Sequence, residues 1–156
     1  MKYLLTSLIA GAVLTAPALA ETTTEADTAD VSVAVSAVGI GVTSLETSMA
    51  FYQDTLGMKS VATFELDYMD EIVLTAPDGG SAIVLMEYTD GIERNVTDLP
   101  VKIVYRTSDP AALATKIKDA GFEIVRFPEP SAAVGGAVVG FAKDPDGYLI
   151  EILPTR

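Results

Sequence analysis

The sequence contains no histidine and no cysteine among its 156 residues. Without these side chains, neither a Ser-His-Asp triad nor a Cys-His pair can be assembled. The absence of cysteine also excludes disulfide bonds, thiolate nucleophiles and cysteine-ligated metal sites. Acid–base catalysis would therefore have to rest on carboxylates, for which Glu87 and Glu151 are the candidates.

Basic residues are scarce. Lys and Arg number 10 against 22 Asp and Glu, which gives a formal net charge of −12. An acidic domain repels phosphate backbones, so we expect no nucleic-acid partner. The negative charge favours cationic ligands, but acidic surfaces also serve solubility alone.

Long apolar runs are confined to the N-terminus. Lys2 precedes a mostly apolar run over residues 3–13, and the stretch over residues 18–20 (ALA) has the small-x-small form of a cleavage site. The run is short for a bilayer span. We therefore expect residues 1–20 to be a signal peptide, and the product to be periplasmic or secreted with no membrane contact after cleavage. The alternative is a retained membrane anchor.

The segment after the predicted cleavage site is polar and acidic. Residues 21–30 (ETTTEADTAD) hold no large apolar side chain, which is typical of disorder. We expect a disordered acidic linker over residues 21–32 and a single compact domain over residues 33–156, a length that is sufficient for a proper core.

Two segments carry helix signals at both ends. In the first, Ser44 is a good N-cap and Gly57 is placed as the terminating glycine. In the second, Asp109 can cap the helix with Pro110 at its first position, and Gly121 ends it. The apolar residues between these signals recur at helical spacing: Leu45, Met49, Tyr52 and Leu56 in the first helix, and Leu113, Ile117 and Ala120 in the second.

Strands and hairpins follow each predicted helix in the same order. We predict strands over residues 58–65 and 82–88 in the first half, and over residues 122–129 and 148–153 in the second. Turns with Asp and Gly occur at residues 77–80 (PDGG) and 144–147 (DPDG). The chain therefore repeats a βαβββ unit, and the fold class is α+β with two tandem βαβββ modules.

Two motifs resemble one known family. The stretch over residues 144–151 (DPDGYLIE) and the helix over residues 48–58 (SMAFYQDTLGM) are similar to those of the vicinal oxygen chelate superfamily, which includes glyoxalase I, bleomycin-resistance proteins and extradiol dioxygenases. The resemblance covers about residues 35–154. It implies a curved eight-stranded sheet around a ligand cavity, with helices on the outside, and a homodimer.

The resemblance also implies four metal-ligand positions, one on the first and last strand of each module. Counting from the motifs places them on Ala37, Leu85, Lys102 and Glu151. Only the glutamate can ligate a divalent cation, and the neighbours of the other three positions supply no better ligand. We therefore expect no metal and no other cofactor.

Alternation along the strands predicts which other side chains share the cavity face with Glu151. The ligand-binding candidates are Glu87, Lys102, Arg106 and Glu151. The other predicted members are Ala37, Gly39, Gly41, Leu85, Val104, Leu149 and Leu153.

Two features of this face are open to two interpretations each. Lys102 and Glu151 can form an ion pair in place of a metal, or Glu151 can be an exposed carboxylate at the cavity mouth. The small residues Gly39 and Gly41 can leave room for a ligand, or they can allow close packing of strands.

Three functions are consistent with these residues. The first is an exported, metal-independent protein that binds a small molecule, as the resemblance to the bleomycin-resistance branch implies. The second is a glyoxalase-like lyase or isomerase, related to lactoylglutathione lyase, with an atypical metal site and Glu151 as the catalytic candidate. The third is a non-catalytic interaction module.

Overall fold

A computed structural model describes residues 34–155 of the chain. The predicted signal peptide and acidic linker lie outside the described residues. Within residues 34–155, no helix has both the length and the apolar character needed to cross a membrane.

The domain consists of two modules with the same order of elements. The first module contains β1 (Ala37–Gly41), α1 (Leu45–Met49) with its π-helical continuation η1 (Ala50–Thr55), β2 (Lys59–Glu65), β3 (Met69–Thr75) and β4 (Ala82–Tyr88). The second module contains β5 (Lys102–Thr107), α2 (Pro110–Asp119), β6 (Ile124–Pro130), the 3-10 turn η2 (Ala132–Val134), β7 (Val138–Lys143) and β8 (Leu149–Pro154).

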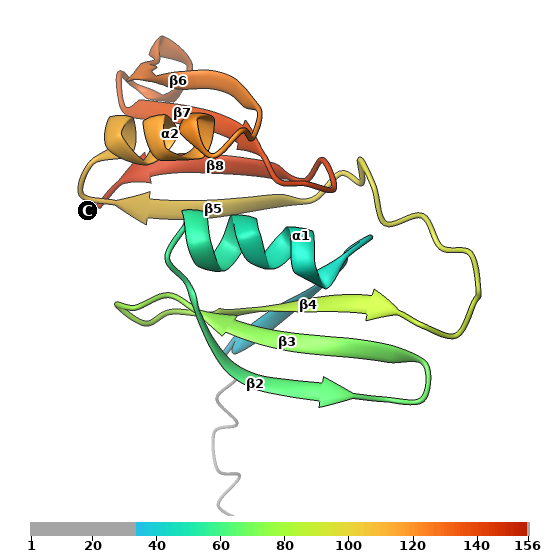
Figure 1. The fold of residues 1–156 in the computed structure, drawn as a ribbon. Helices are drawn as coiled ribbons and strands as arrows, with labels where there is room; N and C mark the ends of the chain where they lie inside the picture. Colours follow the sequence, from blue (N-terminus) through green and yellow to red (C-terminus); the bar gives the residue numbers. More distant parts are fainter. Residues whose placement is uncertain (1–33, 156) are drawn as a thin grey trace, which may run out of the picture. The chain divides into compact units, whose positions relative to one another are not determined.

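Each module forms its own mixed four-stranded sheet (Figure 1). The strand orders are β1-β4-β3-β2 and β5-β8-β7-β6, and the first and last strands of each module pair in parallel. The predicted α+β fold of two βαβββ modules is confirmed. The strands do not, however, join into one eight-stranded sheet within the described residues.

The predicted helix signals are present. The Ser44 side chain accepts a 3.2 Å hydrogen bond from the Thr47 N–H, and the Asp109 side chain accepts one of 2.9 Å from the Ala112 N–H. Gly57 and Gly121, which follow the two helices, have φ values of 79° and 90°. Residues with a side chain rarely adopt this left-handed conformation, so glycine suits both positions.

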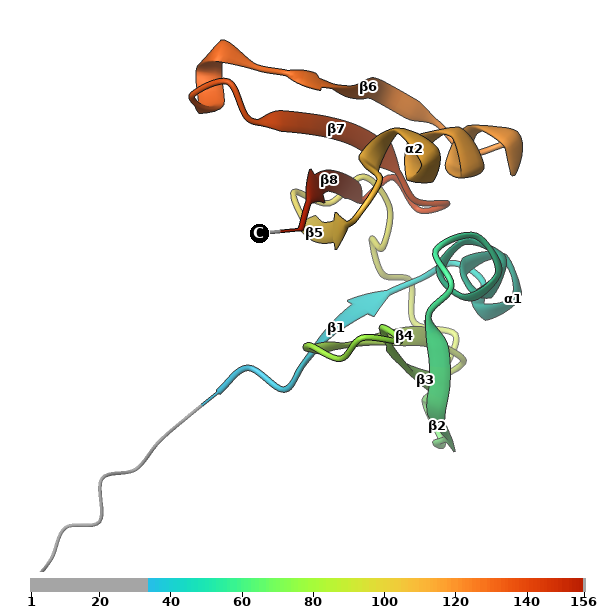
Figure 2. The same ribbon diagram turned by 90° about the vertical axis from the view of Figure 1, so that its left-hand side faces the viewer.

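A single core unites the two modules. Leu74 and Leu85 of the first sheet and Ile150 and Ile152 of the second are fully buried in one cluster, together with residues of both helices. Helix α1 lies between the two sheets in both views (Figures 1 and 2). Each sheet therefore packs one face against helices, and we call the opposite face of each sheet its open face.

The turn between β7 and β8 connects the modules through hydrogen bonds. The buried carboxylate of Asp146 accepts bonds from the Thr43 N–H (3.0 Å) and hydroxyl (2.6 Å) in the first module. Asp144, also buried, accepts from the Tyr52 hydroxyl at 2.6 Å. The Tyr148 hydroxyl donates to the Gly41 carbonyl at 2.7 Å. The motif over residues 144–151 thus holds the two modules together.

Candidate ligand-binding site

An ion pair lies on the open face of the second sheet. The ammonium of Lys102 is 2.6 Å from Oε2 of Glu151, and their side chains are 51% and 13% exposed. Both face away from the helices because Ile150 and Ile152, on either side of Glu151, are buried in the core and side chains alternate along a strand. The ion pair predicted from the sequence is present, and Glu151, whose side chain is 13% exposed, is not the exposed carboxylate of the alternative interpretation.

Strand register extends this site across the whole sheet. Val104 of β5 pairs with Glu151, Glu151 with Phe141 of β7, and Phe141 with Arg126 of β6. The guanidinium carbon of Arg126 lies 5.2 Å from the centre of the Phe141 ring, which confirms that both side chains are on one face. Phe141 and Arg126 were not predicted to belong to the site.

Arg126 is incompletely hydrogen-bonded. Its Nη2 donates to the carbonyl of Val139 at 3.3 Å, but its Nε is buried without a hydrogen-bond partner. Leaving a buried donor unsatisfied costs roughly 1–3 kcal/mol. Neighbouring atoms cover the Nε, so a ligand would have to bind the Nη atoms of the guanidinium.

Arg106 lies on the same open face, where its strand pairs it with Leu153. It is exposed, and its Nη1 donates to the carbonyl of Pro154 at 2.9 Å. The side chains of β5 and β8 that were predicted to share a face therefore do so, and they are Lys102, Val104, Arg106, Leu149, Glu151 and Leu153.

The predicted face of β4 is wrong. Leu85 is fully buried in the core, and the carboxylate of Glu87 accepts a 2.6 Å hydrogen bond from the Leu45 N–H at the start of α1. Both side chains therefore point to the helices. In the observed register Gly39, five residues before the Ser44 cap, pairs with Val84.

The same register explains the error. Val104, five residues before the Asp109 cap, pairs with Glu151, so the counterpart of Glu151 in the first module is Val84 rather than Leu85. The prediction counted Gly80 as one extra turn residue, which shifts β4 by one residue and moves every side chain to the other face.

The two small residues of β1 leave no free space for a ligand. A Cβ on Gly39 would lie 3.1 Å from the Met86 sulfur, and one on Gly41 would lie 2.6 Å from Cγ1 of Val96. Neighbouring side chains thus fill the space beside these glycines, which supports close packing as the reason for glycine.

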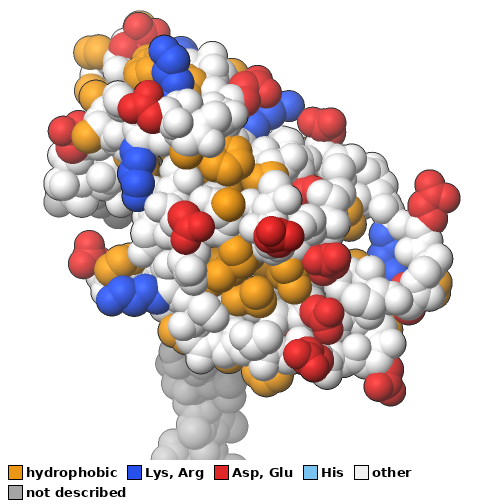
Figure 3. All heavy atoms as spheres, viewed as in Figure 1, with side chains coloured by type: hydrophobic (Ala, Val, Ile, Leu, Met, Phe, Trp, Pro, Cys, Tyr) orange, Lys and Arg blue, Asp and Glu red, His pale blue; other side chains and the backbone are white. Residues whose placement is uncertain are grey.

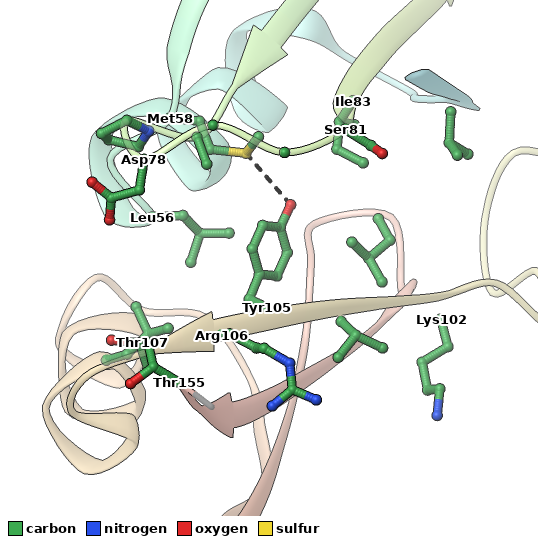
Figure 4. Close-up of a pocket in the computed structure, with 18 of the residues that line it drawn as sticks. Leu56, Met58, Asp78, Ser81, Ile83, Lys102, Tyr105, Arg106, Thr107 and Thr155 are labelled. Carbon is green, nitrogen blue, oxygen red and sulfur yellow. Dashed lines mark hydrogen bonds between the residues drawn. The ribbon is translucent and has the colours of Figure 1, made fainter. Parts of the chain in front are cut away.

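A groove of about 940 Å³ lies between the two modules, on the other side of β5 (Figure 4). Its floor is largely apolar, and the Tyr105 hydroxyl donates to the sulfur of Met58 at 3.4 Å. Burial raises the pKa of Tyr105, so its hydroxyl stays protonated. In Figure 4 the side chains of Lys102 and Arg106 extend away from Tyr105, on the opposite side of the strand.

Charge on the open face differs from that of the rest of the chain. Lys102, Arg106, Arg126 and Lys143 lie on the open face with two carboxylates, Glu151 beside Lys102 and Glu129 beside Val139, and Lys143 pairs with Asp98. The open face therefore has a small excess of positive charge in a chain whose net charge is −12. On the side seen in Figure 3, by contrast, acidic side chains are spread widely, and hydrophobic side chains gather near the middle.

Comparison with known proteins places this architecture in a family. The sequence profile of the glyoxalase/bleomycin resistance protein/dioxygenase superfamily matches residues 34–152. The chain belongs to this superfamily. It is 31% identical over 119 residues to a lactoylglutathione lyase of Escherichia coli O157:H7, an alignment that covers 74% of this chain and 87% of the relative.

Solved structures of this superfamily agree. A glyoxalase I mutant from Zea mays superposes with a TM-score of 0.66 at 25% identity, over 76% of this chain and 44% of the maize protein. An antibiotic-binding protein from a Streptomyces species superposes with a TM-score of 0.64 over 80% of this chain and 97% of that protein. At 17% identity the second comparison shows a shared fold alone.

The residues at the superfamily's metal position do not fit a divalent cation. The Lys102 ammonium already contacts Glu151, and the neighbouring side chains Val104, Phe141 and Leu149 offer no ligand atom. Among residues 34–155, no group of three or more His, Cys, Asp or Glu side chains converges as a metal site would require.

Proposed function

We propose that this superfamily member is an exported protein that binds a small molecule without a metal, on the open face of the second sheet. The observation that carries the proposal is the 2.6 Å Lys102–Glu151 ion pair at the superfamily's metal position. An ammonium there provides a fixed positive charge and up to three donors, so it can orient a polar ligand directly.

We also propose that a second copy of the chain completes the site. Among residues 34–155, the helix-packed faces of both sheets share the core, and nothing lies over the open face that holds Glu151 as an opposite wall. Ligand cavities bury most of a small ligand's surface, which a single flat sheet face cannot do. A homodimer in which the open face of another sheet covers this one would supply the missing wall.

A lyase activity is the second candidate, and the identity to lactoylglutathione lyase supports it. Glu151 would be the acid or base in that case. The ion pair opposes this candidate, because the Lys102 ammonium engages the carboxylate that would have to act as acid or base. An interaction module without a ligand is the third candidate.

Ligand screening by thermal denaturation separates these candidates. The protein is purified from cells that express the full chain, treated with EDTA and mixed with compounds of varied charge. A ligand at a hundred times its Kd stabilises the folded state by about 2.7 kcal/mol, which raises Tm by several degrees. Stabilisation that is lost in Lys102→Met and kept in Lys116→Met, a control on α2, supports binding at this site.

Two results would contradict the proposal. Tm shifts that require added Zn²⁺ or Ni²⁺, with turnover of a hemithioacetal that disappears in Glu151→Gln, would establish the lyase. If no compound gives a Lys102-dependent shift, and no metal restores one, the interaction module is the better account.

A further inference from the structure

Arg126 is placed to act as an anion anchor. It lies on the same face as the Lys102–Glu151 pair, and Phe141 stands between Arg126 and Glu151 in the strand ladder. Its guanidinium covers the Phe141 ring at 5.2 Å, and its buried Nε has no acceptor. A guanidinium with donors to spare matches the two oxygens of a carboxylate.

The surroundings of Arg126 favour an anion with an apolar body. Adjacent strands are about 4.8 Å apart, so the ladder from Arg126 on β6 to Val104 on β5 spans about 14 Å between backbones, and Lys102 lies two residues before Val104. Two long cationic side chains can reach inward over that distance. Between them, Phe141, Leu149 and Val104 form an apolar floor.

The charges on this face disfavour a cationic ligand. Glu151 is the central carboxylate, and the Lys102 ammonium already neutralises it at 2.6 Å. A cationic ligand would have to displace that ammonium while approaching Arg106 and Arg126. The negative net charge of the whole chain therefore does not predict the charge of the ligand at this face.

We propose that the open face of the second sheet binds an aromatic carboxylate, with Arg126 and Lys102 holding the carboxylate and Phe141 and Val104 contacting the ring. The inference rests on the proposed binding function and specifies its ligand class. It assigns Arg126 a binding role for which Arg126→Lys is not equivalent, because lysine keeps the charge and loses the two-pronged geometry.

The test uses 2-naphthoate and its neutral counterpart 2-naphthamide as probes on the purified protein, with affinity measured by calorimetry. We expect naphthoate to bind at least tenfold more tightly than naphthamide, and its affinity to fall as NaCl rises. Arg126→Met should weaken naphthoate binding at least tenfold, and Arg126→Lys should have an intermediate effect. Lys116→Met, which removes the same charge from α2, should leave the affinity unchanged.

A second readout keeps the proposal testable if Arg126→Met fails to fold. Contacts between naphthoate protons and the Phe141 ring are then sought by nuclear Overhauser effects in the unaltered protein, and Lys102→Met replaces the arginine variant in calorimetry.

The inference and the proposed function can fail separately. Equal affinity for naphthoate and naphthamide, no naphthoate binding at 10 mM, or full affinity in Arg126→Met would overturn the ligand class. If neutral or cationic compounds still give Lys102-dependent stabilisation, the proposed binding function stands and only the aromatic carboxylate is wrong as its ligand class. If no compound does, both proposals are wrong.

Discussion

The hydroxyl of Tyr52 donates a 2.6 Å hydrogen bond to the carboxylate of Asp144 across the boundary between the two modules. Tyr52 is fully buried and Asp144 nearly so. Burial, followed by the nearby Asp144 charge, raises the pKa of the Tyr52 hydroxyl far above its usual range, so it remains a donor at all physiological pH values. Within the described residues, no cation forms an ion pair with Asp144, and neutral donors satisfy it instead.

Tyr52→Phe should destabilise the domain. The substitution removes the hydroxyl and leaves one buried carboxylate oxygen of Asp144 without its donor, which costs about 1–3 kcal/mol. Tyr105→Phe is the matched control, because the Tyr105 hydroxyl donates to the sulfur of Met58, a weak acceptor. Urea unfolding measures both free energies, and an equal loss in the two variants would contradict the special role of the Asp144 bond.

The pH dependence of the unfolding free energy should reveal the raised pKa of Asp144. Desolvation raises the pKa of its carboxyl group in the folded state above the unfolded value of about 3.9. The folded state therefore binds this proton more tightly, and the stabilisation is complete below about pH 3.9 and is lost as pH rises through the raised pKa.

Asp144→Asn isolates this contribution from those of the other carboxylates. One of these is Asp90, for which hydrogen bonds from Arg94 lower the pKa to about 2 and so act in the opposite direction. Subtracting the unfolding free energy of Asp144→Asn from that of the wild type at each pH cancels the contribution of Asp90, which is the same in both proteins. The wild type should lose stability relative to the variant as pH rises from 4, and a relative gain would show that the Asp144 pKa is lowered.

The two glycines of β1 should differ in their tolerance of alanine. A methyl group on Gly41 would meet both Cγ1 (2.6 Å) and Cβ (3.3 Å) of the branched Val96, whereas one on Gly39 would meet the flexible end of Met86 at 3.1 Å. We expect Gly41→Ala to cost about 1–3 kcal/mol, as overpacking does, and Gly39→Ala to cost less. Thermal unfolding of the two variants checks the order, which would be reversed if Val96 moves more easily than Met86.

Local signals predicted the parts of the structure that depend on neighbouring residues. The caps Ser44 and Asp109 and the turn glycines Gly57 and Gly121 act within one turn of chain, so their roles can be seen in the sequence. The position of Glu151 on the open face was also predictable, because it follows a well-defined turn.

Features that depend on irregular strands or distant contacts escaped prediction. Glu87 was assigned to the wrong face because Gly80 was counted as an extra turn residue. Arg126 was missed because β6 shifts register between Ile124 and Arg126 and again before Glu129. Phe141 could have been found by counting back across the hairpin from Glu151. The position of α1 between the two sheets depends on packing between modules, which strand patterns do not specify.

The Lys102–Glu151 pair should contribute little to stability. Lys102 is about half exposed, and exposed ion pairs contribute about 0–1 kcal/mol because water and salt screen the attraction. A double-mutant cycle with Lys102→Met and Glu151→Gln, read by urea unfolding, should give a coupling energy in that range that shrinks as NaCl rises. Such a small value means that an ion pair at this position is not retained for folding, so any large effect of these variants on ligand affinity reports binding. A coupling energy of several kcal/mol would instead identify the pair as a structural element of the sheet and would weaken the case for a ligand there.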